Sequence, residues 1–352
     1  MREKRWASFP PFDPRQWADA VNATGFLNSE GWDQQIWVAK SNSFVMPERC
    51  IADSSKGNPW QLQQTLRSFD DVLPALLHGV TGLRMDCDGH RFDANGLADV
   101  HLNMVQLHLD PVSLRGGEEE VRSLLNAGWQ GSCAKNIAID CSERELSDHL
   151  DRFSEGTNLR IWKVSCGDHH LQGENRIDVM TTFCHSMDGW LRWLKLTHAN
   201  VEQELNRFVW QWWVSSDVLE EVAALRALRS LWSRWLVDNQ LPQCSIWIDA
   251  IASTSTFRDE VPTDHLIDLT ASTYAAVIAG ADGIETPPHT GHMLHDDSHK
   301  AGLRWARNIQ HLMREESGLH RTFDPMGGSR TLDTWSSNII EKAWETYLNS
   351  KT

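Results

Sequence analysis

The sequence predicts an α/β protein: a (β/α)8 barrel, or TIM barrel, that follows an irregular N-terminal arm. Short β-like segments alternate with amphipathic helical segments from about residue 66 onwards, which is typical of a parallel sheet with helical crossovers. A chain of 352 residues is long enough for one barrel of this kind. The preceding residues lack the alternation and are rich in turn signals.

Residues 1–65 are predicted to form an arm and a linker. Pro10, Pro11 and Pro14 lie close together, and a turn-rich segment at 53–59 ends in proline. The first residues lack the apolar stretch of a signal peptide, and no run is long enough to cross a membrane. We therefore expect an arm at 1–65 and a barrel at 66–352, in a cytoplasmic protein.

In the first half of the barrel, apolar runs and apolar–polar alternation indicate the strands. They are expected near residues 82–87, 105–109, 137–139, 159–165 and 177–183. Helices are expected at 70–78, at 118–126 and after Ser142, which forms a capping box with Glu145.

The second half predicts strands at 208–215, 244–251, 283–286 and 321–324. Asp217 and Glu220 form a capping box for a helix, and another helix is expected at 264–279. Two apolar stripes predict the last helices: Trp305, Ile309 and Leu312, ending at Gly318, and Trp335, Ile339, Ala343 and Tyr347. These segments make nine strands where a barrel needs eight, so either 159–165 or 177–183 is not a barrel strand.

Charge and cysteine content limit the partners and the compartment. The chain has 48 acidic and 33 basic residues, a net charge of −15, which repels nucleic-acid phosphates and anionic membranes. Its 7 cysteines are scattered and form no Cys-x-x-Cys pair, which indicates reduced thiols. We therefore expect neither nucleic acid nor a membrane as a partner.

Several short motifs of the second half occur together in one known family. They are Ala-Arg-Asn-Ile-Gln at 306–310, Glu-Glu-Ser-Gly-Leu at 315–319 and Asp-Pro-Met-Gly-Gly-Ser at 324–329. With Arg226, Arg229 and Trp232 on one helix, and a weaker echo at 58–63, they resemble the barrel of methylmalonyl-CoA mutases. Gly-Ala-Asp at 280–282 is more similar to the small, non-catalytic subunit than to the large one.

The resemblance implies a supporting role in acyl-CoA isomerisation. It implies a heterodimer with a large catalytic subunit that binds adenosylcobalamin and interconverts methylmalonyl-CoA and succinyl-CoA. The arm would contact that partner. The family's cobalamin-binding motif, Asp-x-His-x-x-Gly, does not occur, and Asp-Cys-Asp-Gly-His at 86–90 has the wrong spacing. We therefore expect no C-terminal cobalamin-binding domain, and a cofactor bound by the partner rather than by this chain.

The family's active-site Tyr-His pair, which follows its fourth strand, is matched only by Cys184-His185. His185 is the one catalytic candidate, as a general acid or as a hydrogen-bond donor to a thioester carbonyl. The neighbouring Tyr is absent, and a structural role for this histidine is the alternative. No cofactor-binding residue is assigned.

Two further departures argue against independent catalysis. Where the family has an arginine on a crossover helix, this chain has Asp268 after Asp264 and His265. Active members resemble one another in threading the CoA pantetheine through a bore lined by small residues. The strand at 208–215 contains Trp210, Trp212 and Trp213, and because side chains alternate, at least one indole faces the interior. We therefore expect a closed bore.

The densest set of metal-capable side chains lies just after the strand at 283–286. A barrel places its active site at this end of the strands, and a divalent metal there could activate water. The spacing matches no defined ligand motif, and a solvated rim loop is the alternative, so no metal site is assigned. The set consists of Glu285, His289, His292, His295, Asp296, Asp297 and His299.

Three other functions stay open on the sequence. The chain could be the substrate barrel of a split acyl-CoA mutase that uses a separate cobalamin-binding protein, which an open bore would favour. It could be a metal-dependent hydrolase or lyase that uses the histidine-rich rim, which stoichiometric bound metal would favour. A self-associating protein without a catalytic partner is the third.

Overall fold

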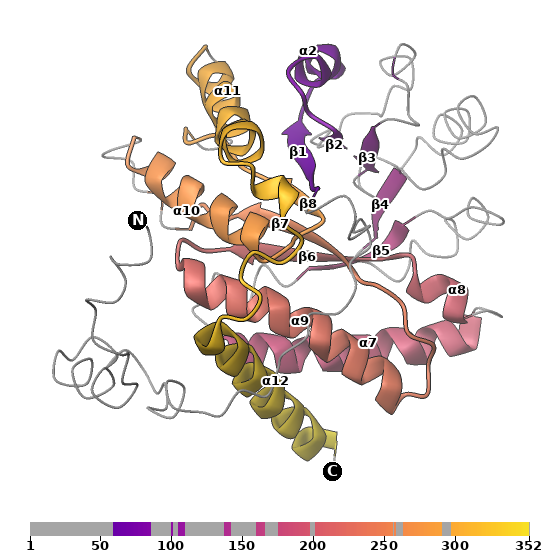
Figure 1. Cartoon of the computed structure of the whole chain (residues 1–352). Helices are drawn as coiled ribbons and strands as arrows, with labels where there is room; N and C mark the ends of the chain where they lie inside the picture. Colours follow the sequence, from indigo (N-terminus) through magenta and orange to yellow (C-terminus); the bar gives the residue numbers. More distant parts are fainter. Residues whose placement is uncertain are drawn as a thin grey trace, which may run out of the picture.

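The computed structural model describes residues 59–85, 100, 105–109, 137–141, 160–165, 175–197, 201–255, 257, 263–290 and 297–351. In this part of the chain, eight parallel strands follow one another around a closed barrel, and the last pairs with the first (Figure 1). The predicted fold class, a (β/α)8 barrel, is confirmed.

The strands are short, and their apolar side chains pack against the surrounding helices. Leu62, Leu83, Leu107, Ile248 and Ile284 are all at most 1% exposed. The bounds are β1 (Gln61–Leu66), β2 (Gly82–Met85), β3 (Gln106–Leu109), β4 (Ile137–Cys141), β5 (Arg160–Ser165), β6 (Phe208–Val214), β7 (Trp247–Ala252) and β8 (Gly283–Glu285).

Helices cover the outside of the barrel. Asp217 caps α9 as predicted, because its Oδ1 accepts a hydrogen bond from the Glu220 backbone N–H at 3.3 Å. The bounds are α2 (Val72–Leu77), α7 (Arg176–Thr197), α8 (Val201–Leu205), α9 (Val218–Asp238), α10 (His265–Ile278), α11 (Asp297–His311) and α12 (Arg330–Lys351). Short turns precede α2 (η4, Phe69–Asp71) and follow α11 (η8, Leu312–Glu316; η9, Leu319–Arg321). No helix of the described ranges is long and apolar enough to cross a membrane.

Two strand predictions are wrong, and one strand was missed. Residues 177–183 lie inside α7, so the other candidate, which corresponds to β5, is the barrel strand. Residues 321–324 form no strand, because they lie at the end of η9 and beyond it. β1 begins at Gln61, within the segment that the sequence assigned to the linker. The count of strands is thereby corrected from nine to the eight that close the barrel.

Several predicted elements lie outside the described residues. These are residues 1–58 of the arm, the helix at 118–126 and the helix after Ser142.

Helix α9 buries three charged side chains, each with a partner on another element. Arg226 donates to Asp324 and, at 2.9 Å, to Asp333. Arg229 donates to Asp282 Oδ2 at 2.7 Å and to the carbonyls of Ile246 and Gly280 at 2.8 Å. The contacts of these two arginines tie α9 to the turn before α12, to α12 itself, to the start of β7 and to the residues just before β8.

The third buried charge of α9 is Glu221. It accepts a hydrogen bond from Trp212 Nε1 at 2.9 Å and from the Ser215 backbone at 2.7 Å, and it pairs with Arg176. Glu221 therefore joins the end of β6 to the start of α7.

Helix α12 lies outside α7 and α9 and packs across both (Figure 1). Ile339, Ala343 and Tyr347 of its predicted stripe are at most 1% exposed. Asp188 of α7 accepts hydrogen bonds from Tyr347 at 2.9 Å and from Trp235 of α9 at 3.0 Å. The three helices therefore form a second layer on this side of the barrel.

The buried pair of Arg229 and Asp282 gives the first testable prediction. Arg229→Met removes the guanidinium that pairs with Asp282, a carboxylate that is 0% exposed. We expect the free energy of unfolding in urea to fall by about 3–5 kcal/mol. The control Arg192→Met, on the exposed face of α7, should change it by less than about 0.5 kcal/mol. Equal losses for the two variants would show that the pair does not stabilise the fold.

Candidate functional site

Most of the interior-facing side chains that the structure describes are polar. Side chains alternate between the two faces of a strand, and the apolar residues of β1, β2 and β3 face the helices. The residues that alternate with them therefore face the interior. On β1, β2 and β3 these are Gln61, Gln63, Thr65, Arg84, Gln106 and His108; on β6, β7 and β8 they include Gln211, Asp249 and Glu285.

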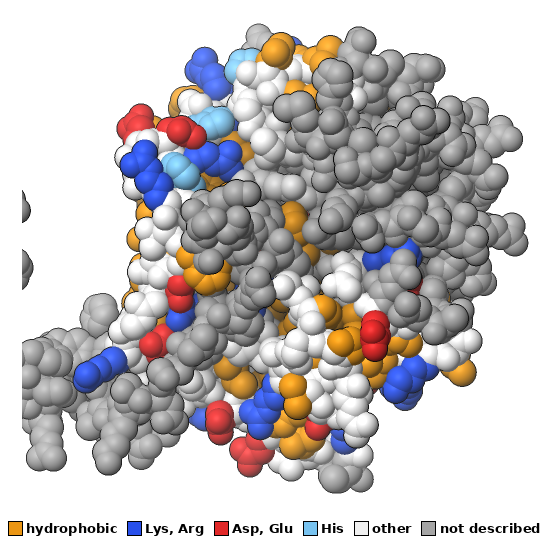
Figure 2. Space-filling view, turned by 45° about the vertical axis from the view of Figure 1, so that its right-hand side comes forward, with side chains coloured by type: hydrophobic (Ala, Val, Ile, Leu, Met, Phe, Trp, Pro, Cys, Tyr) orange, Lys and Arg blue, Asp and Glu red, His pale blue; other side chains and the backbone are white. Residues whose placement is uncertain are grey.

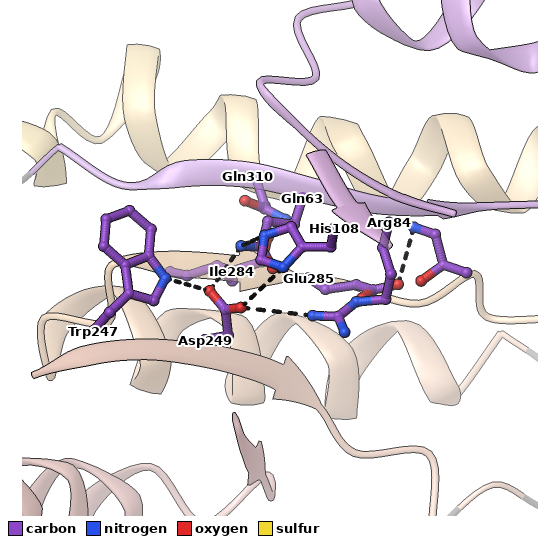
Figure 3. A network of polar contacts seen from close by, with 9 residues as sticks. Gln63, Arg84, His108, Trp247, Asp249, Ile284, Glu285 and Gln310 are labelled. Atoms are coloured by element: carbon purple, nitrogen blue, oxygen red, sulfur yellow. Dashed lines mark hydrogen bonds and ion pairs between the residues drawn. The ribbon is translucent and has the colours of Figure 1, made fainter. Parts of the chain in front are cut away.

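Gln63 lies at the centre of this interior (Figure 3). Its Nε2 donates to Asp249 Oδ1 at 2.8 Å and lies 3.2 Å from His108 Nε2. His108 Nδ1 is in turn 3.6 Å from Asp249 Oδ2. Because the amide nitrogen donates, His108 Nε2 accepts, and the imidazole proton belongs on Nδ1, facing the carboxylate. Three alternate strands thus supply one contiguous polar layer.

A second pair of interior side chains lies beside this layer. Arg84 Nη2 is 3.6 Å from Asp249 Oδ2, and Arg84 Nε is 3.2 Å from Glu285 Oε2. Glu285 Oε1 accepts a hydrogen bond from the Thr65 backbone at 3.1 Å, and Asp249 Oδ1 accepts one from Trp247 Nε1 at 2.7 Å. Each oxygen of the two carboxylates thus has a donor or a cationic or histidine nitrogen within 3.6 Å.

Two glycines make room for the Gln63 side chain. A Cβ on Gly283 would lie 2.1 Å from Gln63 Nε2 and 2.4 Å from Asp249 Oδ1, and one on Gly82 would lie 2.8 Å from Gln63 Cγ. The small residues of β2 and β8 therefore do not line an open channel here, because Gln63 fills the space over them. Gln63, His108 and Asp249 are at most 1% exposed, so solvent does not reach this level.

The interior is also closed next to this layer. Gln106 and Trp247 each lie two residues before a member of the layer, His108 and Asp249, on the same strand face. Gln106 is 1% exposed, and neither polar atom of its amide has a hydrogen-bond partner among the residues that the structure describes. Val209 packs on Trp247 as an apolar cluster separate from the main core.

The tryptophans of β6 contribute less to the closure than the sequence suggested. Trp210 and Trp212 face the helices: Trp210 lies 4.0 Å from Phe183 between ring centroids, and Trp212 binds Glu221. Alternation places only Trp213 on the interior side. The bore is closed mainly by the polar layer around Gln63, which the sequence did not predict.

His185 does not lie at the end of a strand. It is in the middle of α7, where its Nε2 is 2.8 Å from Ser350 Oγ and its ring lies 5.2 Å from that of Tyr347. These contacts join α7 to α12 in the outer helical layer. His185 thus lies between α7 and α12, and none of its contacts is with a described interior residue.

The histidine-rich rim is described only in part. His289 is 9% exposed, its ring stacks on Trp305 at 4.9 Å, and its carbonyl lies 3.0 Å from His265 Nδ1. Glu285 faces the interior instead. His292, His295 and Asp296 lie outside the described residues, as does the side chain of Asp297. The described residues contain no group of three side chains that could hold a metal ion.

The motifs that identified the family prove to be structural in this chain. Arg307 donates to Gln64 of β1 at 2.7 Å. Gln310 accepts from Trp60 Nε1 at 3.0 Å and donates to the Ile284 carbonyl at 3.1 Å. The turn at 324–329 is held by Arg226, as described above. Arg307, Gln310 and Arg226 thus position strands and turns, whereas Gln61 and Gln63, from the weaker echo at 58–63, face the barrel interior.

Gln63 and Gly283 give the second testable prediction, a double-mutant cycle. Gly283→Ala should cost about 1–3 kcal/mol of unfolding free energy, because its methyl group enters the space of Gln63. In a Gln63→Ala background the same change should cost at least about 1 kcal/mol less. Urea unfolding of the four proteins measures both values, and strictly additive costs would show that Gln63 does not fill this space.

His289 gives the third prediction, on pH. Burial, with a smaller effect from His265, lowers the pKa of His289. The unfolded chain therefore takes up a proton more readily than the folded one, and stability falls as the pH drops from about 7 to about 5. His289→Phe keeps the ring stack and removes the titration, so the acid-side slope of stability should be smaller. An unchanged slope between these pH values would contradict this assignment.

Comparisons with known proteins match the chain to the same family as the sequence motifs. Residues 175–349 match the family model of methylmalonyl-CoA mutase. The small subunit of this mutase from Streptomyces virginiae is 24% identical over 84% of the chain and 52% of its own length. That from Porphyromonas gingivalis is 30% identical over 44% of the chain and 26% of its length.

A large subunit is among the relatives as well. That of Propionibacterium freudenreichii is 26% identical over 53% of the chain. The chain thus spans about half or less of the length of these relatives, 52% for the Streptomyces virginiae protein. Together with the barrel, these matches confirm that the chain resembles the methylmalonyl-CoA mutase family, and its small subunits in particular.

Proposed function

We propose that this chain is a non-catalytic subunit that supports a separate methylmalonyl-CoA mutase subunit. The partner binds adenosylcobalamin and interconverts methylmalonyl-CoA and succinyl-CoA, while this chain supplies stability and a contact surface. The resemblance to small subunits supports the pairing. The observation that carries the proposal is the closed barrel interior around Gln63.

The interior does not fit the thioester substrate of this family. An extended pantetheine chain needs a continuous space along the barrel axis. In this chain, Gln63 occupies the space over Gly82 and Gly283, and its amide is held by Asp249 and His108. Opening the space would break these contacts and leave a buried carboxylate with fewer partners, which is costly. We therefore derive no catalytic step within this chain.

The same observations give less support to a split mutase and to a metal-dependent hydrolase. A split mutase would use this chain as its substrate barrel, and the filled interior argues against that role. A metal-dependent hydrolase would need several ligands on the rim. Of the described rim residues, His299 lies in α11, His289 stacks on Trp305, and Glu285 is engaged with Arg84 and Thr65. Neither His289 nor Glu285 is placed to share a metal with the other.

The fourth prediction tests the proposed function directly. The chain is mixed with a candidate large mutase subunit and titrated with adenosylcobalamin, while complex mass and cofactor absorbance are followed. We expect a one-to-one complex in which the cofactor saturates at one equivalent per large subunit. The isolated chain should bind neither the cofactor nor methylmalonyl-CoA in a calorimetric titration. The large subunit alone is the control for both ligands.

Two results would overturn the proposal. Binding of acyl-CoA or cofactor by the isolated chain would make its barrel an active site. Failure to form any complex with a large subunit from the same source would remove the supporting role.

A further inference from the structure

A cluster of aromatic rings joins β6 to the outer helical layer. Trp210 of β6 lies 6.4 Å from Trp232 of α9 between ring centroids, and Trp232 stacks on Trp235 at 5.7 Å. Asp188 of α7 accepts hydrogen bonds from Trp235 Nε1 at 3.0 Å and from the hydroxyl of Tyr347 at 2.9 Å. One carboxylate therefore links these stacked indoles to a phenol on α12.

A branch of the same cluster leads towards the surface. Trp193 of α7 is half-buried, and its ring lies 5.6 Å from that of Trp190. Phe208 packs between Trp190, at 5.6 Å, and Trp232, at 6.5 Å. Trp232 and Tyr347 are at most 2% exposed. On the surface of the lower part of Figure 2, charged and hydrophobic side chains lie side by side. The cluster therefore has a partly accessible end at Trp193 and a buried end at Tyr347.

Indole and phenol rings lose an electron to a strong oxidant more readily than other aromatic side chains do. The electron deficiency can then move between such rings where they lie near contact. A phenol becomes a stable neutral radical only if its hydroxyl proton leaves together with the electron. A tyrosine therefore collects the oxidation of neighbouring indoles when a base is placed to accept that proton.

Tyr347 has such a base. Both oxygens of the Asp188 carboxylate lie within 3.0 Å of its hydroxyl oxygen. Lys351 Nζ is 3.1 Å from Asp188 Oδ2 and favours the ionised carboxylate. Burial, followed by the hydrogen bond to Asp188, raises the pKa of Tyr347. The phenol therefore keeps its proton at neutral pH until an electron is removed from the ring.

We propose that Tyr347, with Asp188 as its proton acceptor, is a redox-active tyrosine at which one-electron oxidation of the aromatic cluster ends. A strong one-electron oxidant, such as an oxygen-centred radical, takes one electron from an indole of the cluster. Tyr347 then gives one electron to the indole radical cation, and its hydroxyl proton passes to Asp188. The indole is restored, and a neutral tyrosyl radical and a protonated carboxyl group are formed. This activity needs no partner subunit and goes beyond the proposed function.

The chain contains 2 tyrosines, so the experiment has a matched control. Tyr274 lies on α10 and forms no hydrogen bond with a carboxylate in the described part of the chain. The full chain is oxidised with a photo-excited ruthenium(II) polypyridyl complex and an irreversible electron acceptor, frozen, and measured by electron paramagnetic resonance. Wild type and Tyr274→Phe should give a tyrosyl signal. Tyr347→Phe keeps the ring but should lose this signal and leave a tryptophan radical.

Two further variants test the proton acceptor and the path of the electron. Asp188→Asn keeps an oxygen that accepts hydrogen bonds but removes the base, so the tyrosyl signal should be lost. Trp232→Phe with Trp235→Phe should lower the signal, because phenylalanine does not relay the oxidation. The control for this pair is Trp213→Phe with Trp305→Phe, which changes two indoles outside the cluster and should leave the signal unchanged.

Three results would overturn the proposal. They are a wild type that shows only tryptophan radicals, a tyrosyl signal that persists in Tyr347→Phe, and a signal that disappears in Tyr274→Phe. An undiminished signal in Asp188→Asn would remove the carboxylate from the proposed step.

Discussion

Three buried charges on α9 fix how the second half of the barrel is assembled. Glu221, Arg226 and Arg229 each reach different neighbours, and each buried charge would lose hydrogen bonds if those neighbours moved. An apolar helix face tolerates small sliding, but fixed hydrogen bonds to charged groups do not. The positions of β6, β7 and β8 follow from these contacts. Asp249 and Glu285 therefore reach the interior at the height where Gln63 and Arg84 meet them.

The resemblance to the mutases and the closed interior are compatible. Motif residues such as Arg307, Gln310 and Asp324 tie strands and turns together, so their presence identifies a barrel of this type without implying an active site. The interior is where the chain departs from the bore expected of active members. Gly82 and Gly283 are small, as in an open bore, yet one glutamine side chain covers both. Arg307, Gln310 and Asp324 thus hold the scaffold, whereas Gln63, which belongs to the echo at 58–63, fills the channel.

The sequence predicted the fold class and the second-half helices well, because caps and apolar stripes are local signals. Asp217 caps α9 as its spacing indicated. Residues 177–183 were misassigned because their apolar residues fit both a strand and a helical spacing, and only their place in α7 decides between the two. β1 was missed because its interior-facing residues are glutamines. The Gln63 layer joins residues 45 and 186 positions apart, and no local pattern encodes such contacts.

The closure of the barrel has a consequence for synthesis of the chain. Trp60 is hydrogen-bonded to Gln310, 250 residues later, and β1 pairs with β8. A nascent chain that has emerged only as far as β7 has an open sheet with two unpaired edges, and such edges promote association with other chains. Contacts this distant in sequence also slow folding. The exposure of those edges during translation therefore ends only when β8 and α11 have been synthesised.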